Sequence, residues 1–264
     1  YFKAHYLDNL DFSDERLIRT PLFHNKIEFY FKNLVVQAPD SINVAADYVV
    51  GKAKANKELF KYVVWYITYH YETSNIMGME GVFVHMVENY YTKNQAYWLD
   101  SAQTFRIMDR AKSLKPLLVG KKAPALVLED TLGKPRNMYD IKAKYTVLLF
   151  WDPDCGHCQK DVPRLAAAYD TLKSLNAEVY AADGAVEDEK WRKFIKKHNL
   201  KWINVADMGL HNYFRTTYDL KSYPQLYILN EKKEIIARKI GVGQIVDFIQ
   251  RYEEMEKKKK AAKS

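Results

Sequence analysis

The sequence predicts an all-α helical bundle followed by an α/β domain with a mixed sheet. Residues from about 11 to 118 keep the apolar spacing of amphipathic helices. After residue 121, strand-like apolar runs alternate with helical stretches, which is the pattern of an α/β sandwich. The only two cysteines, Cys155 and Cys158, lie where one predicted strand meets a helix. We therefore expect a helical domain at 1–118, an α/β domain at 119–256 and a basic tail at 257–264.

The helical part contains five stretches with apolar residues at helical spacing. They are Leu22–Leu34, Ile42–Ala53, Glu58–Tyr71, Val82–Tyr91 and Asp100–Leu114. Asp40-Ser41 and Asp100-Ser101 are candidate helix starts, because short polar side chains accept hydrogen bonds from the free N–H groups of a first turn. Five or six helices are enough for a bundle.

In the second part, strands and helices alternate along the chain. The expected strands are Ala125–Leu128, Tyr145–Trp151, Glu178–Ala182, Trp202–Ala206, Gln225–Leu229 and Ile235–Val242. The expected helices are Cys158–Leu175, Asp188–His198, Leu210–Tyr218 and Gln244–Glu256. A short polar turn joins the last two strands, so they must be antiparallel. We expect Pro163 to kink the first of these helices.

Composition and charge describe an ordinary globular chain. It has 264 residues, of which 48% are hydrophobic and 28% charged, with a formal net charge of +8. Five lysines at 257–260 and 263 account for much of this charge, and we interpret them as a solvated, frayed tail rather than a nucleic-acid-binding or membrane-binding segment. No apolar run is long enough for a transmembrane helix. The chain opens at Tyr1 without a signal-peptide pattern, so we expect a mature or trimmed form.

The tetrapeptide Cys155-Gly156-His157-Cys158 is the sequence feature that points to chemistry. Two cysteines separated by two residues at a strand-to-helix turn form a redox-active dithiol. The helix dipole would stabilise a Cys155 thiolate, and Cys158, one turn further on, would resolve the mixed disulfide. His157 would add a positive or hydrogen-bonding group, whereas Asp154 acts in the opposite direction. The net effect of these two neighbours on the redox balance stays open.

A metal site is the alternative interpretation of the cysteine pair. Structural zinc needs four ligands, usually a second cysteine pair or a histidine pair, and the chain offers neither. His70, Glu72 and His85 do not form a metal-binding spacing. We therefore expect no metal and no cofactor other than the Cys155–Cys158 disulfide itself.

Further motifs accompany the dithiol between residues 120 and 255, including a proline inside the first helix and a glycine before the last one. They are Ala123-Pro124, Leu132-Gly133-Lys134, Val147 to Trp151, Cys155 to Cys158, Pro163, Ser222-Tyr223-Pro224 and Gly241. With these residues the second part resembles the thioredoxin-like TlpA/ResA group of extracytoplasmic thiol–disulfide oxidoreductases. The resemblance implies a thioredoxin fold, with Cys155 as the attacking cysteine and Cys158 as the resolving one.

The resemblance also implies roles for residues around the dithiol. Pro224 corresponds to the cis-proline that shapes the substrate groove, and with Tyr223, Trp151 and Asp154 it would face the substrate. Asp161 lies where this group often has a glutamate. It would be either a proton acceptor for Cys158 or a solvated acid in the first helical turn.

Three positions distinguish the chain from other members of the superfamily. Leu149 occupies the place of thioredoxin's buried aspartate, and Asp154 the place of the tryptophan before its first cysteine. The Gly156-His157 pair is that of protein disulfide isomerases, which favours oxidation or isomerisation. The substrate-facing surface is therefore not thioredoxin's own.

We hypothesise a thiol–disulfide oxidoreductase of a bacterial envelope compartment, either free in the periplasm or lipid-anchored, that acts on protein thiols and disulfides. The helical part resembles uncharacterised N-terminal regions of bacterial envelope proteins and would select substrates, dock a redox partner or form a homodimer. A rival hypothesis is a partner-binding scaffold with a low-turnover thioredoxin-like domain. A peroxidase of the same superfamily fits less well, because no threonine lies just ahead of Cys155.

Overall fold

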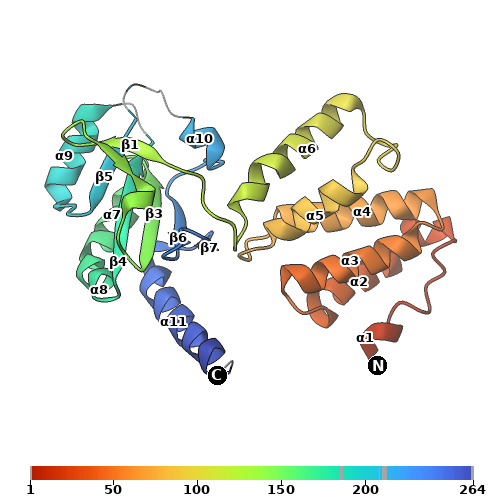
Figure 1. Cartoon of the computed structure of the whole chain (residues 1–264). Helices are drawn as coiled ribbons and strands as arrows, with labels where there is room; N and C mark the ends of the chain where they lie inside the picture. Colours follow the sequence, from red (N-terminus) through yellow and green to blue (C-terminus); the bar gives the residue numbers. More distant parts are fainter. Residues whose placement is uncertain (1, 185–186, 208, 210–212, 263–264) are drawn as a thin grey trace. The chain divides into compact units, whose positions relative to one another are not determined.

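The chain divides into two compact units, Tyr1–Lys115 and Pro116–Ser264. Figure 1 traces both in a computed structural model, which describes residues 2–184, 187–207, 209 and 213–262. The division falls close to the boundary that we expect at residues 118 and 119.

The first unit is helical, as predicted. Its α-helices are α1 Phe2–His5, α2 Pro21–Phe29, α3 Pro39–Ala53, α4 Lys57–Glu72, α5 Glu80–Tyr90 and α6 Ser101–Leu114. A 3₁₀-helix spans Glu15–Arg19, and a π-helix at Tyr30–Leu34 extends α2. The five predicted helical stretches thus correspond to α2 with its π extension and to α3, α4, α5 and α6.

The two predicted helix starts have different outcomes. Asp100 caps α6 by accepting from the Gln103 N–H, and the Gln103 side chain accepts from the Asp100 N–H in return. Asp40 does not cap α3, because that helix already begins at Pro39 with Ala38 as its N-cap. Proline suits a first helical position, since its fixed φ is helical and no N–H is lost there. The prediction for Asp40 is therefore wrong by two residues.

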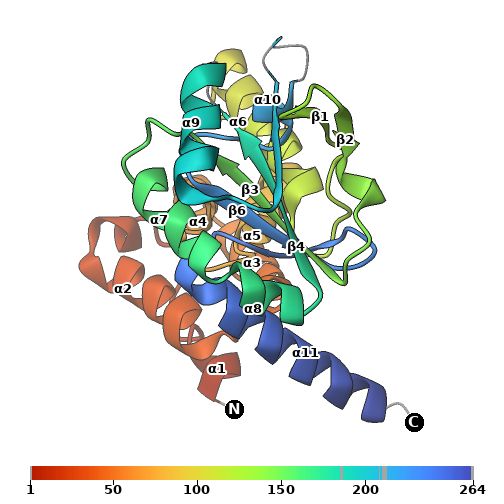
Figure 2. The ribbon, with the colours of Figure 1, turned by 90° about the vertical axis from the view of Figure 1, so that its left-hand side faces the viewer.

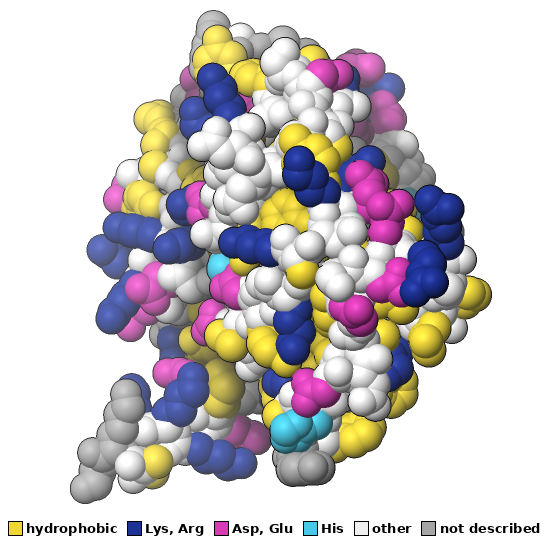
Figure 3. Space-filling model, turned by 90° about the vertical axis from the view of Figure 1, so that its right-hand side faces the viewer, with side chains coloured by type: hydrophobic (Ala, Val, Ile, Leu, Met, Phe, Trp, Pro, Cys, Tyr) yellow, Lys and Arg dark blue, Asp and Glu magenta, His cyan; other side chains and the backbone are white. Residues whose placement is uncertain are grey.

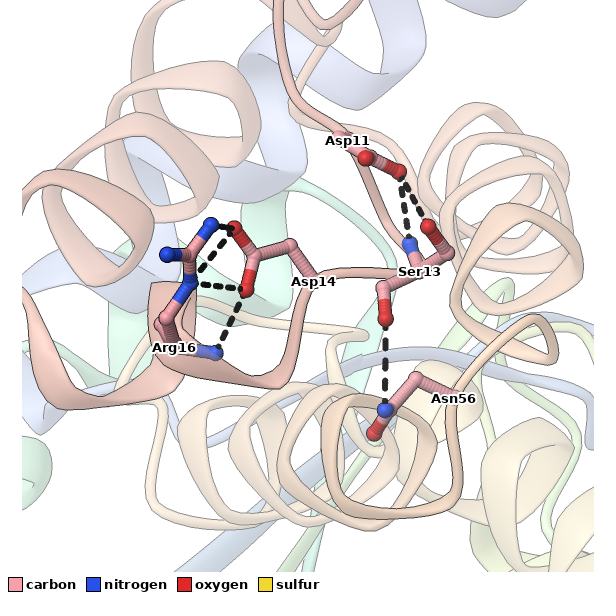
Figure 4. Close-up of polar contacts among 5 residues, drawn as sticks. All are labelled: Asp11, Ser13, Asp14, Arg16 and Asn56. Carbon is pink, nitrogen blue, oxygen red and sulfur yellow. Dashed lines mark hydrogen bonds and ion pairs between the residues drawn. The ribbon is translucent and has the colours of Figure 1, made fainter.

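The start of α4 is joined to the segment before α2 (Figure 4). The Asn56 side-chain oxygen accepts from the N–H groups of Glu58 at 2.9 Å and Leu59 at 3.2 Å. Its amide nitrogen donates to the Ser13 carbonyl at 3.5 Å. Close by, Asp14 caps the 3₁₀-helix through the Arg16 N–H. Asn56 thus both caps α4 and holds a distant part of the chain against it.

Aromatic side chains fill much of the first unit's core. Phe23, Phe31 and Phe83 are almost completely buried. Other aromatics remain at the surface, among them Trp65 and Tyr69, which stack on successive turns of α4 with their planes 8° apart. On the face that Figure 3 presents, basic and acidic side chains are interspersed with exposed hydrophobic ones.

The second unit alternates strands and helices. Its strands are β1 Val127–Asp130, β2 Pro135–Asn137, β3 Tyr145–Trp151, β4 Ala177–Asp183, β5 Ile203–Ala206, β6 Gln225–Leu229 and β7 Ile235–Arg238. Its α-helices are α7 Cys158–Ala167, α8 Tyr169–Ser174, α9 Asp188–His198, α10 Phe214–Thr217 and α11 Ile245–Ala261. Short 3₁₀-helices lie at Lys115–Leu117, Met138–Asp140 and Val242–Gln244.

The strands form one mixed sheet in the order β2-β1-β5-β4-β3-β6-β7. β3, β4 and β5 are parallel, and the other neighbours pair antiparallel, including the predicted pair β6 and β7. β3 is central and buried along its whole length. Strand β2 is absent from the predicted elements, because its three residues Pro135–Asn137 show no apolar alternation.

Helices cover both faces of this sheet. Phe150 stacks on Phe214 of α10 and contacts Tyr218, whereas Trp151 contacts Phe194 of α9. Consecutive strand residues point to opposite faces, so α10 and α9 lie on opposite sides of β3. Figure 2 shows α7, α8 and α9 in front of the strands. The prediction of a mixed sheet flanked by helices is confirmed.

Several element boundaries differ from the predicted ones. The helix expected at Cys158–Leu175 continues through Pro163 and is interrupted at Ala168, giving α7 and α8. The strand expected at Ile235–Val242 ends at Arg238. Residues 210–212 of the helix expected at Leu210–Tyr218 lie outside the described residues.

The C-terminal lysines are also placed differently than we expect. The helix α11 continues through Lys257–Lys260 and ends at Ala261, so these four lysines are helical. Lysine has a high helix propensity, and cations near the C-terminus interact favourably with the helix dipole. The four side chains are exposed, as expected.

Candidate active site

Strand β3 carries the chain from the sheet centre to the cysteines. Its last residue, Trp151, pairs in register with Asp183 of β4 and is completely buried against Phe194, with ring centroids 5.0 Å apart. The expectation that Trp151 contacts substrate is therefore wrong. Strand alternation points its ring into the core, just before the dithiol turn begins.

The two cysteines differ in exposure although only two residues separate them. Cys158 is the first residue of α7 and is fully buried, whereas Cys155 is partly exposed. The carbonyl of Cys155 already accepts a helical hydrogen bond from the Gln159 N–H at 3.0 Å, so the helical turn starts around it. Burial raises the pKa of the Cys158 thiol well above its ordinary value, so this group stays protonated.

The exposed sulfur faces the loop before β6. Cys155 Sγ donates to the Tyr223 carbonyl at 3.2 Å. The Tyr223–Pro224 peptide bond is cis, which is the geometry that the resemblance implies for this proline. The 223–224 loop and the cysteine turn therefore lie opposite each other, although they are 68 residues apart.

Asp154 and His157 lie on the exposed side of the turn. The Asp154 carboxylate forms an ion pair with Lys190 of α9, with Nζ and Oδ2 2.7 Å apart, and Lys190 also contacts Glu187 at 3.1 Å. His157 is the exposed N-cap residue of α7. A cation from another helix thus offsets the charge of Asp154 next to Cys155, a partner that the local sequence does not reveal.

Two acids lie near the cysteine turn, in different surroundings. Asp161 is in the first turn of α7 and pairs with Arg164, with Nη1 and Oδ1 3.3 Å apart. Asp152 precedes the cysteine turn and acts electrostatically on Cys158, and its carboxylate accepts from the Asp154 N–H at 2.7 Å. The observed partner of Asp161 fits the interpretation as a solvated helix acid, and Asp152 is the acid beside Cys158.

In comparison with known proteins, each unit matches a described family or domain. Residues 119–238 match the AhpC/TSA family, and residues 1–115 match DUF5106, a domain of unknown function. A domain of possible thiol-disulfide isomerase from Cytophaga hutchinsonii ATCC 33406 is 44% identical, with 54% of this chain and 98% of that domain covered at a TM-score of 0.52. The second unit belongs to the AhpC/TSA family.

Two further relatives extend the comparison. Thiol-disulfide oxidoreductase ResA of Bacillus cereus is 28% identical to this chain over 123 residues, which cover 47% of this chain and 70% of ResA. A thioredoxin-like protein from Bacteroides caccae ATCC 43185 matches both units together, covering 94% of this chain and 90% of its own at a TM-score of 0.74 and 22% identity. The latter shows the shared fold.

The AhpC/TSA domain contains site neighbours that the sequence analysis did not select. Arg215 of α10 donates to the Gly184 carbonyl at 2.9 Å, and its charge acts on the Tyr223 side chain. The Tyr223 phenol is half-buried there rather than free to face a substrate. The available signal was Gly184, two residues after the predicted strand Glu178–Ala182, since a glycine at a strand often marks a close approach of another group.

Within the described part of the chain, no three or more His, Cys, Asp or Glu side chains come together in a way that could hold a metal ion. In the same residues, no helix combines the length and the apolar character needed to span a bilayer.

Proposed function

We propose that this protein is a thiol–disulfide oxidoreductase that exchanges disulfides with partner proteins through Cys155 and Cys158. The observation that supports it best is the pairing of a partly exposed sulfur with a fully buried one in the same turn. The exposed sulfur also lies against the 223–224 loop. An accessible attacking thiol and a protected resolving thiol are what dithiol exchange requires.

The exchange would proceed in two steps. The Cys155 thiolate attacks one sulfur of a partner disulfide, which forms a mixed disulfide and releases the other partner sulfur as a thiolate that takes up a proton. Cys158 then loses its proton and attacks the Cys155 sulfur. The bond from Cys155 to the partner breaks, the Cys155–Cys158 disulfide forms, and two electrons have passed to the partner. Partner oxidation is the same sequence reversed.

The proposed location is the extracytoplasmic bacterial envelope, as the resemblance to the TlpA/ResA group implies. Protein disulfides, the proposed substrates, form and persist in such oxidising compartments. Cell fractionation followed by immunoblotting tests the proposal, and recovery of the protein in the cytosolic fraction alone would contradict it.

Reduction of insulin disulfides tests the activity. We expect turnover by the wild type and none by Cys155→Ser. Cys158→Ser should accumulate a mixed disulfide, because the resolving step is blocked while attack continues. Equal turnover by the wild type and Cys155→Ser would exclude the proposed enzyme activity. A partner that copurifies equally with a Cys155→Ser/Cys158→Ser double variant would instead support the scaffold alternative.

The reduction potential of the Cys155/Cys158 couple gives the direction of exchange. A potential of about −270 mV would indicate a reductase, and a potential between about −180 and −120 mV would indicate an oxidant or isomerase.

A further inference from the structure

The Tyr223 side chain packs on the backbone at the end of β4. A Cβ atom added to Gly184 would lie 2.2 Å from the Tyr223 hydroxyl oxygen and 2.3 Å from Cζ. No such contact exists between real atoms, so only a residue without a side chain leaves room for the ring. The phenol is therefore seated on Gly184.

Gly184 is itself connected to the dithiol strand. Its N–H donates to the carbonyl of Trp151 at 2.7 Å, which continues the pairing of β4 with β3 by one residue. The backbone on which the phenol rests is thus fixed to the residue where the cysteine turn begins.

Arg215 closes this arrangement from α10. Its Nη2 donates at 2.9 Å to the carbonyl of Gly184, the residue on which the Tyr223 ring is seated. The charges of Arg215, Asp152 and Asp183 all act on the Tyr223 phenol, so the guanidinium supplies positive charge beside two carboxylates. A planar group with several donors can hold the Gly184 carbonyl and still face the phenol.

These contacts form one connected path through the site. It runs from Trp151 to Gly184, from Gly184 to Arg215 and to the Tyr223 ring seated on it, and from the Tyr223 carbonyl to the Cys155 sulfur. The Arg215 charge acts on the phenol of the same ring. We propose that Arg215 is a positioning residue for disulfide exchange, which holds the 223–224 loop against Cys155 through the Tyr223 side chain. This inference rests on the proposed oxidoreductase function.

The position of the loop matters for both thiol and partner. The Tyr223 carbonyl accepts a hydrogen bond from the Cys155 thiol at 3.2 Å, a contact that the sulfur must give up before it reacts. A partner disulfide that reaches Cys155 must also lie beside this loop. A loosened loop would therefore expose a more reactive sulfur and bind the partner less well.

The test compares Arg215→Ala, Arg215→Lys and Tyr223→Phe with the wild type. Arg251→Ala is the control, because Arg251 lies on α11 and pairs with Asp247 at the surface. For Arg215→Ala we expect Cys155 alkylation by iodoacetamide at neutral pH to be about fivefold faster, the size expected for one lost hydrogen bond. We expect KM for insulin to rise by about the same factor with kcat nearly unchanged. Arg215→Lys should restore part of both effects, because lysine keeps a donor for the Gly184 carbonyl.

A double variant shows whether Arg215 acts through the phenol. Since the hydroxyl is gone in Tyr223→Phe, adding Arg215→Ala should change the alkylation rate less than it does in the wild type. The proposal is overturned if Arg215→Ala, folded by circular dichroism, keeps alkylation rate and KM within about twofold of the wild type. If Arg215→Ala does not fold, the alkylation rate and KM of Arg215→Lys and Tyr223→Phe are compared with the wild type by the same twofold limit. Alkylation needs no partner, so it tests the positioning role even if the wild type fails to reduce insulin.

Discussion

At the scale of single residues, the site depends on a difference between two identical side chains. Cys155 and Cys158 share one turn, yet the sheet and α7 exclude solvent only from Cys158. Desolvation disfavours a thiolate, so burial and not the tetrapeptide itself separates the attacking from the resolving cysteine.

This difference predicts selective labelling. When the reduced, folded protein is treated with iodoacetamide at neutral pH, Cys155 should carry nearly all of the label and Cys158 almost none. The reason is that alkylation requires an accessible thiolate, and burial raises the pKa of Cys158. Mass spectrometry of the digested protein measures the ratio. Both cysteines should react after unfolding in urea, and equal labelling of the folded protein would contradict the assignment.

At the scale of elements, caps explain why some boundaries are visible in the sequence. α6 begins after Asp100 with a complete capping box, whereas α3 begins at a proline with no side-chain cap. The helix start at Asn56 adds a tertiary function, because the capping side chain also donates to the Ser13 carbonyl.

Asn56 therefore offers a test that separates two contributions. Asn56→Ala should lower the free energy of unfolding by about 1 kcal/mol, because two N–H groups of α4 lose their acceptor. Asn56→Asp should lose less, since a carboxylate still caps the helix and favours its N-terminus, while the bond to Ser13 is lost. Urea unfolding followed by circular dichroism measures both values. An equal loss of unfolding free energy in the two variants would show that the bond to Ser13 contributes more than the helix cap.

At the scale of the whole molecule, both units bury tyrosine side chains among the aliphatic residues of their cores. Burial raises the pKa of Tyr66 and Tyr71 in the first unit and of Tyr180 and Tyr218 in the second. These phenols ionise with their ordinary pKa only in the unfolded protein. Each folded-state pKa lies above the unfolded value of about 10. The contribution of these neutral phenols to the free energy of unfolding is therefore complete below that pH, and it is lost as the pH rises above it.

We accordingly expect alkaline unfolding of the protein above about pH 10, together with tyrosine ionisation. Burial lowers the pKa of Lys233, so this group changes the stability only at pH values below its ordinary pKa of 10.5. It therefore does not cause the alkaline transition. Ultraviolet absorbance of tyrosinate and far-ultraviolet circular dichroism, measured on the same samples, should change together. Full tyrosine ionisation with unchanged circular dichroism would show that these phenols are not protected by the fold.

The sequence by itself determined the elements with strong local patterns and the chemistry of the dithiol. The bounds of β3 and α9 agree with the predicted ones, because continuous apolar strands and amphipathic helices leave a periodic signal. Only the tertiary structure decided which way Trp151 points and which acid lies beside Cys158. It also brought together Gly184, Arg215 and Tyr223, since contacts between residues far apart in the chain have no local pattern from which they could be predicted.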